Sequence, residues 1–362
     1  SACLLLLHRV QDGSSLSSGV LDPISGLWAM LDFLKHLVGL AGPIIGGQGA
    51  FRYQYIPGLL ELPPGTSFQD CHGLVVDAEH NIYLTYVSKN STADPHCLIR
   101  WRPDGTGGEF LTGGGSALCA GTPHGLTLAT EDGGEQFLYH ANNAKTLTKT
   151  KLDGTVVWQH KGNFGQDPTL PFKPTWFAVP PASRYIYLCD GYGSNNIYVF
   201  DRYDGSYMNV TYGGKGGRDQ HGRFSTNHGC LYDERSGKIA VSDRANSRIE
   251  YFDFEAGSPH GLRYSHTSDM VQAMGPGTLP CNLRTYPEHG GHGVMPDLSG
   301  PVAVVDEENN VVSVVNVSVL LTAEQDKHPH DAMLLPNGDM VVATWNPGHI
   351  SYWKKLDEGI VI

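Results

Sequence analysis

The sequence predicts an all-β protein built as a six-bladed β-propeller, and three observations lead to this prediction. A short motif, in which a histidine opens a hydrophobic strand, recurs along the chain. Each copy is followed by a tight turn and a second strand, which is the pattern of a β-hairpin. The copies follow one another at a nearly constant interval of 51 to 53 residues. A period of this length, made of short strands, is typical of four-stranded propeller blades.

Five copies of the motif can be read directly, and the intervals predict a sixth. The readable copies are centred on His72, His124, Thr175, His228 and His330. The step between the last two is 102 residues, twice the usual interval, so a further copy is expected near residue 279. The first five blades are placed at 66–115, 116–165, 166–215, 216–256 and 257–320, and the sixth follows them.

The last blade needs a strand from the other end of the chain. Only 32 residues follow His330, which is too few for four strands. The stretch 50–56 is the natural donor, and such closure removes the open sheet edge that favours aggregation. The propeller is therefore predicted over 49–362, and 1–48 is an N-terminal extension. Within it 25–41 reads as a helix that either packs on the propeller or lies on a membrane surface, because charged residues interrupt it and it is too short for a span.

Charge and composition exclude two classes of partner. The formal net charge is −12, and no run of Lys or Arg is present, so a nucleic-acid surface is not expected. The glycine-rich stretch 212–217 is not followed by the strand, loop and helix of a phosphate-binding loop, so a nucleotide site is not expected either.

Cysteines and glycosylation sequons favour a secreted protein. The seven cysteines include no C-x-x-C pair, which argues against a zinc site made of thiolates, and one or two disulfides are possible. Three acceptor sequons begin at Asn90, Asn209 and Asn316. We therefore expect the secretory pathway lumen or the cell exterior.

The histidines of alternate blades predict a metal centre on the propeller axis. The first strand of a blade lines the central channel, so residues at its start form a ring. His124, His228 and His330 belong to the second, fourth and sixth blades, which stand roughly 120° apart. Three histidines with an open fourth position are how a catalytic zinc is held, and imidazole also suits other first-row metals. His72, in the first blade, is left open as a fourth ligand, a second-shell donor or a structural residue.

Two turns are expected to face the mouth of the channel beside this centre. Each follows a strand that ends in aspartate, and they carry Tyr192 and Arg244. A tyrosine and an arginine beside a metal would supply a proton acceptor and an anion clamp. Arg248 is expected to pair with a neighbouring carboxylate. His289 and His292, on a glycine-rich loop, are expected to lie outside the centre.

Several of these motifs, taken in register, resemble one known family. From about residue 66 to 356 the chain resembles peptidyl-α-hydroxyglycine α-amidating lyase, within the wider NHL-repeat propellers. The matching motifs, in their order and separations, are Pro123-His124-Gly-Leu, Lys173-Pro174-Thr175, Asp190-Gly191-Tyr192, Asn227-His228, Asp243-Arg244-Ala-Asn and Pro329-His330-Asp331.

The resemblance implies a role for each matching residue. His124, His228 and His330 would bind zinc, Tyr192 would be the catalytic base, and Arg244 would contact the substrate carboxylate or the reacting oxygen. A structural calcium would be bound by the side chain of Asp331 and the backbone carbonyls of Leu74 and Leu126, whose hard oxygen atoms suit that ion. The implied reaction cleaves a carbinolamide C–N bond, giving a primary amide and glyoxylate.

The chain also departs from the family pattern. The resemblance implies a second arginine in the first blade, where this sequence has Lys89, and a point charge cannot make the bidentate contact of an arginine. It implies a disulfide at positions that are Gly193 and Ala240 here. No copper monooxygenase domain is present in the sequence, so a separate monooxygenase would supply the hydroxylated small-molecule or peptide C-terminal substrate.

Two other functions remain open at this stage. One is a non-catalytic propeller that keeps the ring of histidines and serves as a binding or scaffold module. The other is a calcium-dependent hydrolase of the lactonase type, which also places a metal on the propeller axis. That class uses carboxylate and asparagine oxygens, whereas histidines dominate here.

Overall fold

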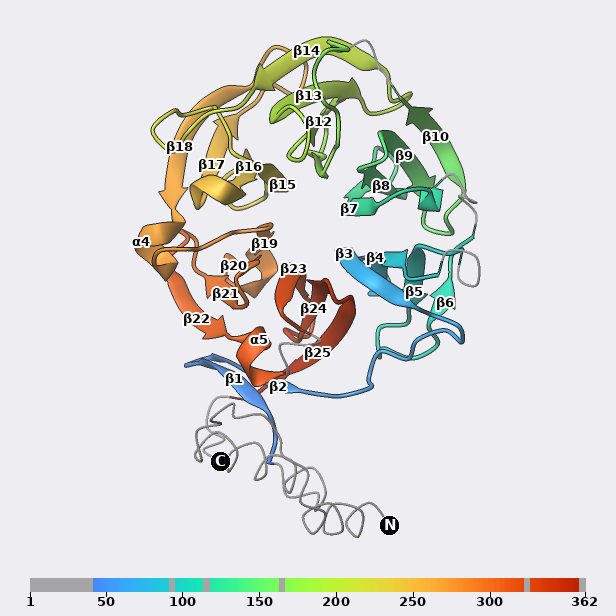
Figure 1. Cartoon of the computed structure of the whole chain (residues 1–362), viewed down its shortest axis with the longest axis vertical. Coiled ribbons are helices and arrows are strands. Elements are labelled where there is room, and N and C mark those ends of the chain that lie inside the picture. Colours follow the sequence, from blue (N-terminus) through green and yellow to red (C-terminus); the bar gives the residue numbers. More distant parts are fainter. Residues whose placement is uncertain (1–41, 91–94, 113–117, 163–166, 322–325, 358–362) are drawn as a thin grey trace, which may run out of the picture. The chain divides into compact units, whose positions relative to one another are not determined.

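The computed structural model describes residues 42–90, 95–112, 118–162, 167–321 and 326–357. Residues 45–362 form one compact unit, in which six antiparallel sheets surround a central axis (Figure 1). The predicted six-bladed propeller is therefore confirmed. The helix expected over 25–41 lies outside the described residues. Among the residues that are described, no helix is long and apolar enough to cross a membrane.

The first three blades each contain four strands, and Figure 1 shows the first strands of blades one and two, β3 and β7, nearest the axis. Blade one consists of β3 (Phe68–Val76), β4 (Ile82–Ser88), β5 (Leu98–Trp101) and β6 (Glu109–Phe110). Blade two consists of β7 (Pro123–Thr130), β8 (Gln136–Asn142), β9 (Thr146–Lys151) and β10 (Val156–Lys161). Blade three consists of β11 (Trp176–Ala178), β12 (Tyr185–Cys189), β13 (Asn196–Asp201) and β14 (Tyr207–Gly213).

The next two blades have the same order and carry short helical turns. Blade four consists of β15 (Asn227–Asp233), β16 (Lys238–Asp243), the 3-10 helix η1 (Arg244–Asn246), β17 (Arg248–Asp253) and β18 (Arg263–Asp269). It is followed by the helix α4 (Met270–Met274). Blade five consists of β19 (Arg284–Tyr286), the 3-10 helix η2 (Pro287–His289), β20 (His292–Pro296), β21 (Val302–Val305) and β22 (Val311–Val315), followed by α5 (Val317–Leu320).

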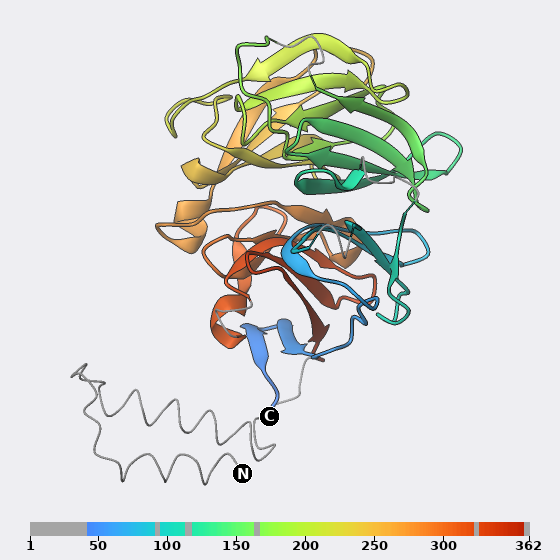
Figure 2. The same cartoon turned by 45° about the vertical axis from the view of Figure 1, so that its right-hand side comes forward.

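Blade six joins the two ends of the chain, as the sequence predicts. It combines β23 (His328–Leu334), β24 (Met340–Trp345) and β25 (His349–Lys355) with β1 (Ile45–Gln48) and β2 (Phe51–Tyr55). The donor strand β2 pairs antiparallel with β25, and β1 adds a fifth strand outside it. Figure 2 shows these two N-terminal strands beside the last strand of the chain. Tyr53 of β2 is fully buried in the resulting core.

The observed boundaries differ from the predicted ones in two places. β1 begins at Ile45, so the propeller starts before residue 49. The outer strand of blade four is β18 at 263–269, which the spacing assigned to blade five. The reason is a long connection between β17 and β18, so the fourth strand begins later in the sequence than the regular spacing of the blades predicts. The hidden copy expected near residue 279 is Pro280-Cys281-Asn282-Leu283, which ends next to β19.

The apolar core lies between neighbouring blades rather than inside any one of them. One buried cluster joins Trp176 and Tyr187 of blade three to Cys230 and Ile239 of blade four. Because both faces of each sheet are covered by another blade, most strand residues are buried on both sides. This explains why the strands read as continuous hydrophobic runs in the sequence.

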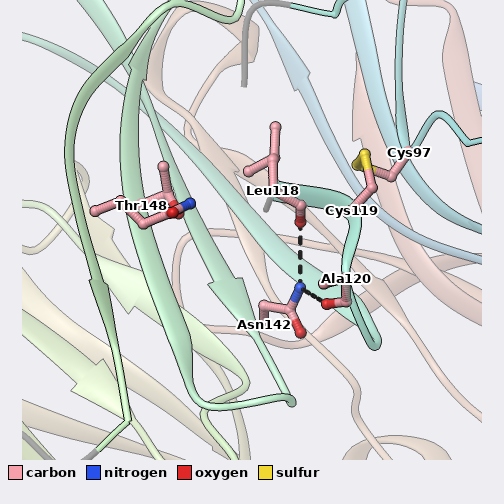
Figure 3. Close-up of a disulfide and its surroundings, with 7 residues drawn as sticks. Cys97, Leu118, Cys119, Ala120, Asn142 and Thr148 are labelled. Atoms are coloured by element: carbon pink, nitrogen blue, oxygen red, sulfur yellow. Dashed lines mark hydrogen bonds between the residues drawn. A yellow bond between two sulfur atoms is a disulfide. The ribbon is translucent and has the colours of Figure 1, made fainter. Parts of the chain in front are cut away.

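A disulfide connects the first two blades. Cys97, just before β5, is bonded to Cys119, in the segment that leads into β7. Figure 3 shows Asn142 of β8 holding that segment, because its side-chain amide donates to the carbonyls of Leu118 at 3.2 Å and Ala120 at 2.7 Å. Cys71, Cys189, Cys230 and Cys281 are free and buried.

Candidate metal centre

Four buried histidines meet on the axis of the propeller. His124, His228 and His330 lie near the starts of the inner strands β7, β15 and β23, and His72 lies in the middle of β3. All four are at most 2% exposed. Five pairs among their rings have centroids 4.6 to 4.8 Å apart. The structure thus brings together the three predicted zinc ligands and adds His72 to the same cluster.

The glycine after each of three histidines explains how the inner strands approach so closely. A Cβ atom at Gly125 would lie 2.2 Å from the carbonyl oxygen of Thr175, and one at Gly229 would lie 2.7 Å from that of Cys281. Real side chains cannot be accommodated at such distances. The His-Gly pair read in the sequence is therefore a requirement for packing strands at the axis.

Hydrogen bonds to backbone carbonyls fix the tautomer of the three predicted ligands. The Nδ1 atoms of His124, His228 and His330 bond to carbonyl oxygens at 2.9, 2.7 and 3.3 Å. These oxygens belong to Thr175, Cys281 and His72 respectively, each at the corresponding place one blade further on. A carbonyl can only accept, so Nδ1 carries the proton and Nε2 is left with a free lone pair. This arrangement is common for histidines that bind a metal through Nε2.

The free lone pairs face one another. The Nε2 atoms of His330 and His124 lie 3.2 Å apart, although neither carries a proton in this tautomer. The Nδ1 atom of His72 lies 3.4 Å from the same Nε2 atom of His330, and the Nε2 atom of His72 is buried without a hydrogen-bond partner. Buried lone pairs that repel each other or have no partner are costly, and a bound cation would satisfy them. The donor set therefore fits zinc or another first-row metal.

Two overlapping sets of three histidines could form such a site. The ligand atoms of His72, His124 and His330 lie within 4.8 Å of one another. His228 has the right tautomer, but its Nε2 atom accepts a hydrogen bond from Tyr192 at 2.9 Å. The shared carbonyl bonds favour His124, His228 and His330 as the ligands, whereas the short distances favour His72, His124 and His330.

Burial keeps the cluster uncharged. It lowers the pKa of His72, His228 and His330 well below the ordinary value, and it lowers the pKa of His124 to about 3. Neutral imidazole is the form that binds a metal, so these side chains need not lose protons at neutral pH.

Tyr192 and Arg244 lie beside the histidines, as predicted. The Tyr192 hydroxyl donates to Nε2 of His228 and accepts from Nη1 of Arg244 at 3.1 Å. The guanidinium lies over the tyrosine ring, 5.2 Å from its centroid. Burial raises the pKa of Tyr192, and the charge of Arg244 opposes that rise. Tyr192 is 38% exposed, so this residue is accessible from solvent while the histidines are not.

Cys281 completes the ring of six and was not identified from the sequence. It holds the place in blade five that a histidine or threonine holds elsewhere, and its carbonyl accepts the bond from His228. Burial raises the pKa of its thiol to about 12. The signal that could have located it is Pro280-Cys281-Asn282-Leu283, which matches Pro123-His124-Gly125-Leu126 at its first and last residues.

The calcium ligands expected from the resemblance are assembled, but their partner is an arginine. The carboxylate of Asp331 and the carbonyls of Leu74 and Leu126 all bond to the guanidinium of Arg284. In the structure the chain itself thus supplies a positive charge to these oxygens, and the calcium site stays a prediction.

The other candidate residues lie away from the centre. Lys89 is exposed in the turn after β4, and no contact between its side chain and the four histidines is found in the described part of the chain. His289 and His292 bond to the carbonyls of Leu335 and His289, as expected for residues outside the site. Arg248 pairs with Asp243 at 2.9 Å and Glu250 at 3.1 Å, as expected.

Trp176 packs its ring against those of His124, His228 and His330. Its ring lies 6.1 Å from that of His330, in a stacked arrangement, and the guanidinium of Arg284 lies 5.9 Å from the tryptophan ring. Trp176 and Arg284 also line a separate pocket of about 420 Å³, which none of the four histidines lines. Glu234 and Glu288 are among its other lining residues.

Comparison with known proteins identifies the fold and no family. No family model matches the chain, and no curated protein matches its sequence. A solved gluconolactonase from Xanthomonas campestris is 14% identical, with a TM-score of 0.52 over 88% of this chain and 92% of that one.

Two further solved structures are similar to this chain to about the same degree. A luciferin-regenerating enzyme is 10% identical, with a TM-score of 0.55 over 87% of this chain and 96% of that chain. A calcium-binding protein, regucalcin, from Agrobacterium tumefaciens is 12% identical, with a TM-score of 0.53 over 81% of this chain and 92% of that one. At such identities the likeness establishes the propeller fold alone.

Proposed function

We propose that this chain is a zinc-dependent lyase that cleaves the C–N bond of a carbinolamide and releases a primary amide and glyoxylate. One observation carries the proposal. Carbonyl bonds at Nδ1 leave the Nε2 atoms of His124, His228 and His330 unprotonated within one cluster of rings, and a tyrosine hydroxyl beside them bonds both to His228 and to Arg244. A metal, a proton acceptor and an anion-binding cation are the groups that this reaction requires.

Each residue has a role in the proposed reaction. His124, His228 and His330 hold the metal, and when bound there zinc supplies positive charge that polarises the substrate hydroxyl and favours the phenolate of Tyr192. Tyr192 removes the hydroxyl proton as the C–N bond breaks, and the departing amide nitrogen takes up a proton. The guanidinium of Arg244 holds the carboxylate of the α-hydroxyglycine unit by charge-assisted hydrogen bonds.

Metal content and glyoxylate release test the proposal. Purified protein should contain about one zinc or other transition metal per chain, and His124→Ala should lose it. N-acyl-α-hydroxyglycine should release glyoxylate faster than its spontaneous breakdown. Tyr192→Phe should lower kcat by about 100-fold or more with the metal retained. Tyr203→Phe, which changes an exposed tyrosine elsewhere in blade three, is the matched control. No glyoxylate from metal-loaded protein contradicts the proposal.

His72 decides whether the metal centre is closed or open. A fourth protein ligand would leave no position for substrate, as in structural zinc sites. His72→Ala should therefore leave zinc content unchanged if the centre is catalytic. If His72→Ala and His228→Ala both lose zinc, as His124→Ala does, all four histidines are ligands, the centre is structural, and the non-catalytic binding module becomes the better description. If His72→Ala loses zinc while His228→Ala keeps it, the ligands are His72, His124 and His330 instead.

A lactonase is the second candidate, because solved propellers described as gluconolactonases share the fold. The axial donor set speaks against a calcium-dependent reaction here, since nitrogen ligands suit zinc while calcium prefers oxygen. Hydrolysis of a sugar lactone in the presence of calcium, with no release of glyoxylate, would favour this candidate.

The substrate and the compartment follow from the same proposal. A carbinolamide must first be made by an enzyme that inserts oxygen into a C–H bond at the α-carbon of a glycine, so we propose that a separate monooxygenase acts before this protein.

The disulfide between Cys97 and Cys119 and the exposed sequon residues Asn90, Asn209 and Asn316 support a location in the secretory pathway.

A further inference from the structure

The guanidinium of Arg284 connects three inner strands of the propeller. Its Nε and Nη2 atoms bond to the two carboxylate oxygens of Asp331, at 3.0 and 2.6 Å. Nη2 also bonds to the carbonyl of Leu74 and reaches the carbonyl of Leu126 at 3.5 Å. Arg284 itself begins β19, so one side chain links blade five to blades one, two and six.

The bonded groups lie directly behind the histidine cluster. Leu74 is the second residue after His72, Leu126 is the second after His124, and Asp331 follows His330. These are the three histidines whose ligand atoms lie within 4.8 Å of one another. Each residue that Arg284 contacts lies one or two positions after a histidine in the sequence. Displacement of Arg284 would therefore displace the imidazoles.

Burial makes the contact rigid. Asp331, Leu74 and Leu126 are 0% exposed, and the side chain of Arg284 is 19% exposed on the side of the 420 Å³ pocket. Asp331 also accepts bonds from the backbone amide of Leu74 at 2.8 Å and from the Asn282 side chain at 3.2 Å. The planar guanidinium holds its donors in a fixed fork, so the acceptors are fixed relative to one another.

We propose that Arg284 is a positioning residue that sets the spacing of the histidine cluster, and that it acts as a built-in cation in place of a bound divalent ion. In part this rests on the proposed metal centre. The three groups that it binds are hard oxygen donors, one of them anionic, which is the ligand set that calcium takes. Removal of the guanidinium therefore leaves a latent calcium site, open to solvent through the pocket.

Wild-type protein and Arg284→Ala test the two parts separately. The melting temperature of the wild type should respond neither to calcium nor to a chelator specific for it. Arg284→Ala should melt several degrees lower, and millimolar calcium should restore much of the loss. Arg248→Ala is the matched control, because Arg248 is also buried and paired with carboxylates but lies in the outer part of blade four. It should be destabilised without any response to calcium.

The spacing of the histidines is tested with Co²⁺ as the probe ion. Arg284→Ala should bind Co²⁺ about 10 to 100-fold more weakly than the wild type, as for other residues that orient metal ligands. Its visible absorption spectrum should change, and calcium should reverse both effects. Arg284→Lys keeps the charge without the fork and serves if the alanine variant does not fold. It should show the same change in spectrum with a smaller loss of stability.

The outcomes distinguish this inference from the proposed function. An Arg284→Ala variant that binds Co²⁺ like the wild type and melts without response to calcium overturns the inference. If the wild type binds no transition metal, the proposed lyase is wrong, while the calcium response of Arg284→Ala still decides whether Arg284 replaces a divalent ion.

Discussion

The buried histidines of this protein differ in the hydrogen-bond partners of their ring nitrogens. His124, His228 and His330 have backbone carbonyls on one side, which leaves their Nε2 lone pairs free, and those of His124 and His330 lie 3.2 Å apart. His140 of β8 is also buried, yet its Nε2 atom bonds to the Thr150 hydroxyl at 3.0 Å, and its Nδ1 atom has no hydrogen-bond partner among the described residues. Burial alone therefore does not make a metal ligand, and convergence of several rings does.

The pH dependence of stability should report His140. Burial lowers its pKa to about 3 in the folded protein, from an ordinary value near 6.5. The unfolded chain therefore binds one more proton between these values, so the stability that neutral His140 retains above pH 6.5 is lost as the pH falls towards 3.

We expect the difference in unfolding free energy between wild type and His140→Gln to shrink by up to about 1.4 kcal/mol per pH unit below pH 6.5. Urea unfolding of both proteins across this range measures it. Two pH profiles that run parallel would show that His140 does not titrate in this way.

At the scale of elements, the propeller depends on two contacts that join distant segments. β2 closes blade six through its pairing with β25, and the disulfide joins blade one to the segment before blade two. Neither contact lies within one sequence repeat. Both should therefore affect the stability of the ring as a whole.

Removal of β1 and β2 should open the ring. A chain that begins at residue 57 exposes the edge of β25 and loses Tyr53, whose burial alone is worth about 3 kcal/mol or more. A chain that begins at residue 42 keeps both strands and is the matched control. The shorter chain should melt at a lower temperature and aggregate in size-exclusion chromatography. Equal behaviour of the two chains would mean that β2 is dispensable.

Loss of the disulfide should destabilise the protein measurably. The bond closes a loop with a sequence separation of 22, for which the chain-entropy model gives about 3 kcal/mol. Replacement of both Cys97 and Cys119 by alanine should lower the unfolding free energy by about this amount. A reductant should lower the stability of the wild type and leave that of the double variant unchanged. A wild type that is insensitive to reductant would show that the bond is not formed.

At the scale of the whole molecule, the exposed glycosylation sequons allow the proposed secretory location to be tested. Asn90, Asn209 and Asn316 are exposed and come from blades one, three and five. Expression through a eukaryotic secretory pathway should therefore give a protein with up to three glycans. An endoglycosidase should reduce its mass, and each Asn→Gln replacement should reduce the mass by that of one glycan. A secreted protein with no change in mass would contradict glycosylation, although not the fold.

The repeat in the sequence was sufficient for the number of blades, their approximate limits and the histidines on the axis. This is because each blade repeats the same local chemistry, with a polar residue at the start of an inner strand and glycine where strands approach. Tyr192 and Arg244 were also found, since their turns follow recognisable strands ending in Asp190 and Asp243.

Only the tertiary structure decided which groups complete the site. Arg284 contacts the backbone of Leu74, 210 residues away in the sequence, and that of Leu126, 158 residues away. No periodicity of the chain marks it, because it stands three residues after the copy of the motif that carries Cys281 in place of histidine. The oxygens expected to bind calcium could be read from sequence. The cation that they bind depends on which side chain the closed ring brings to the axis.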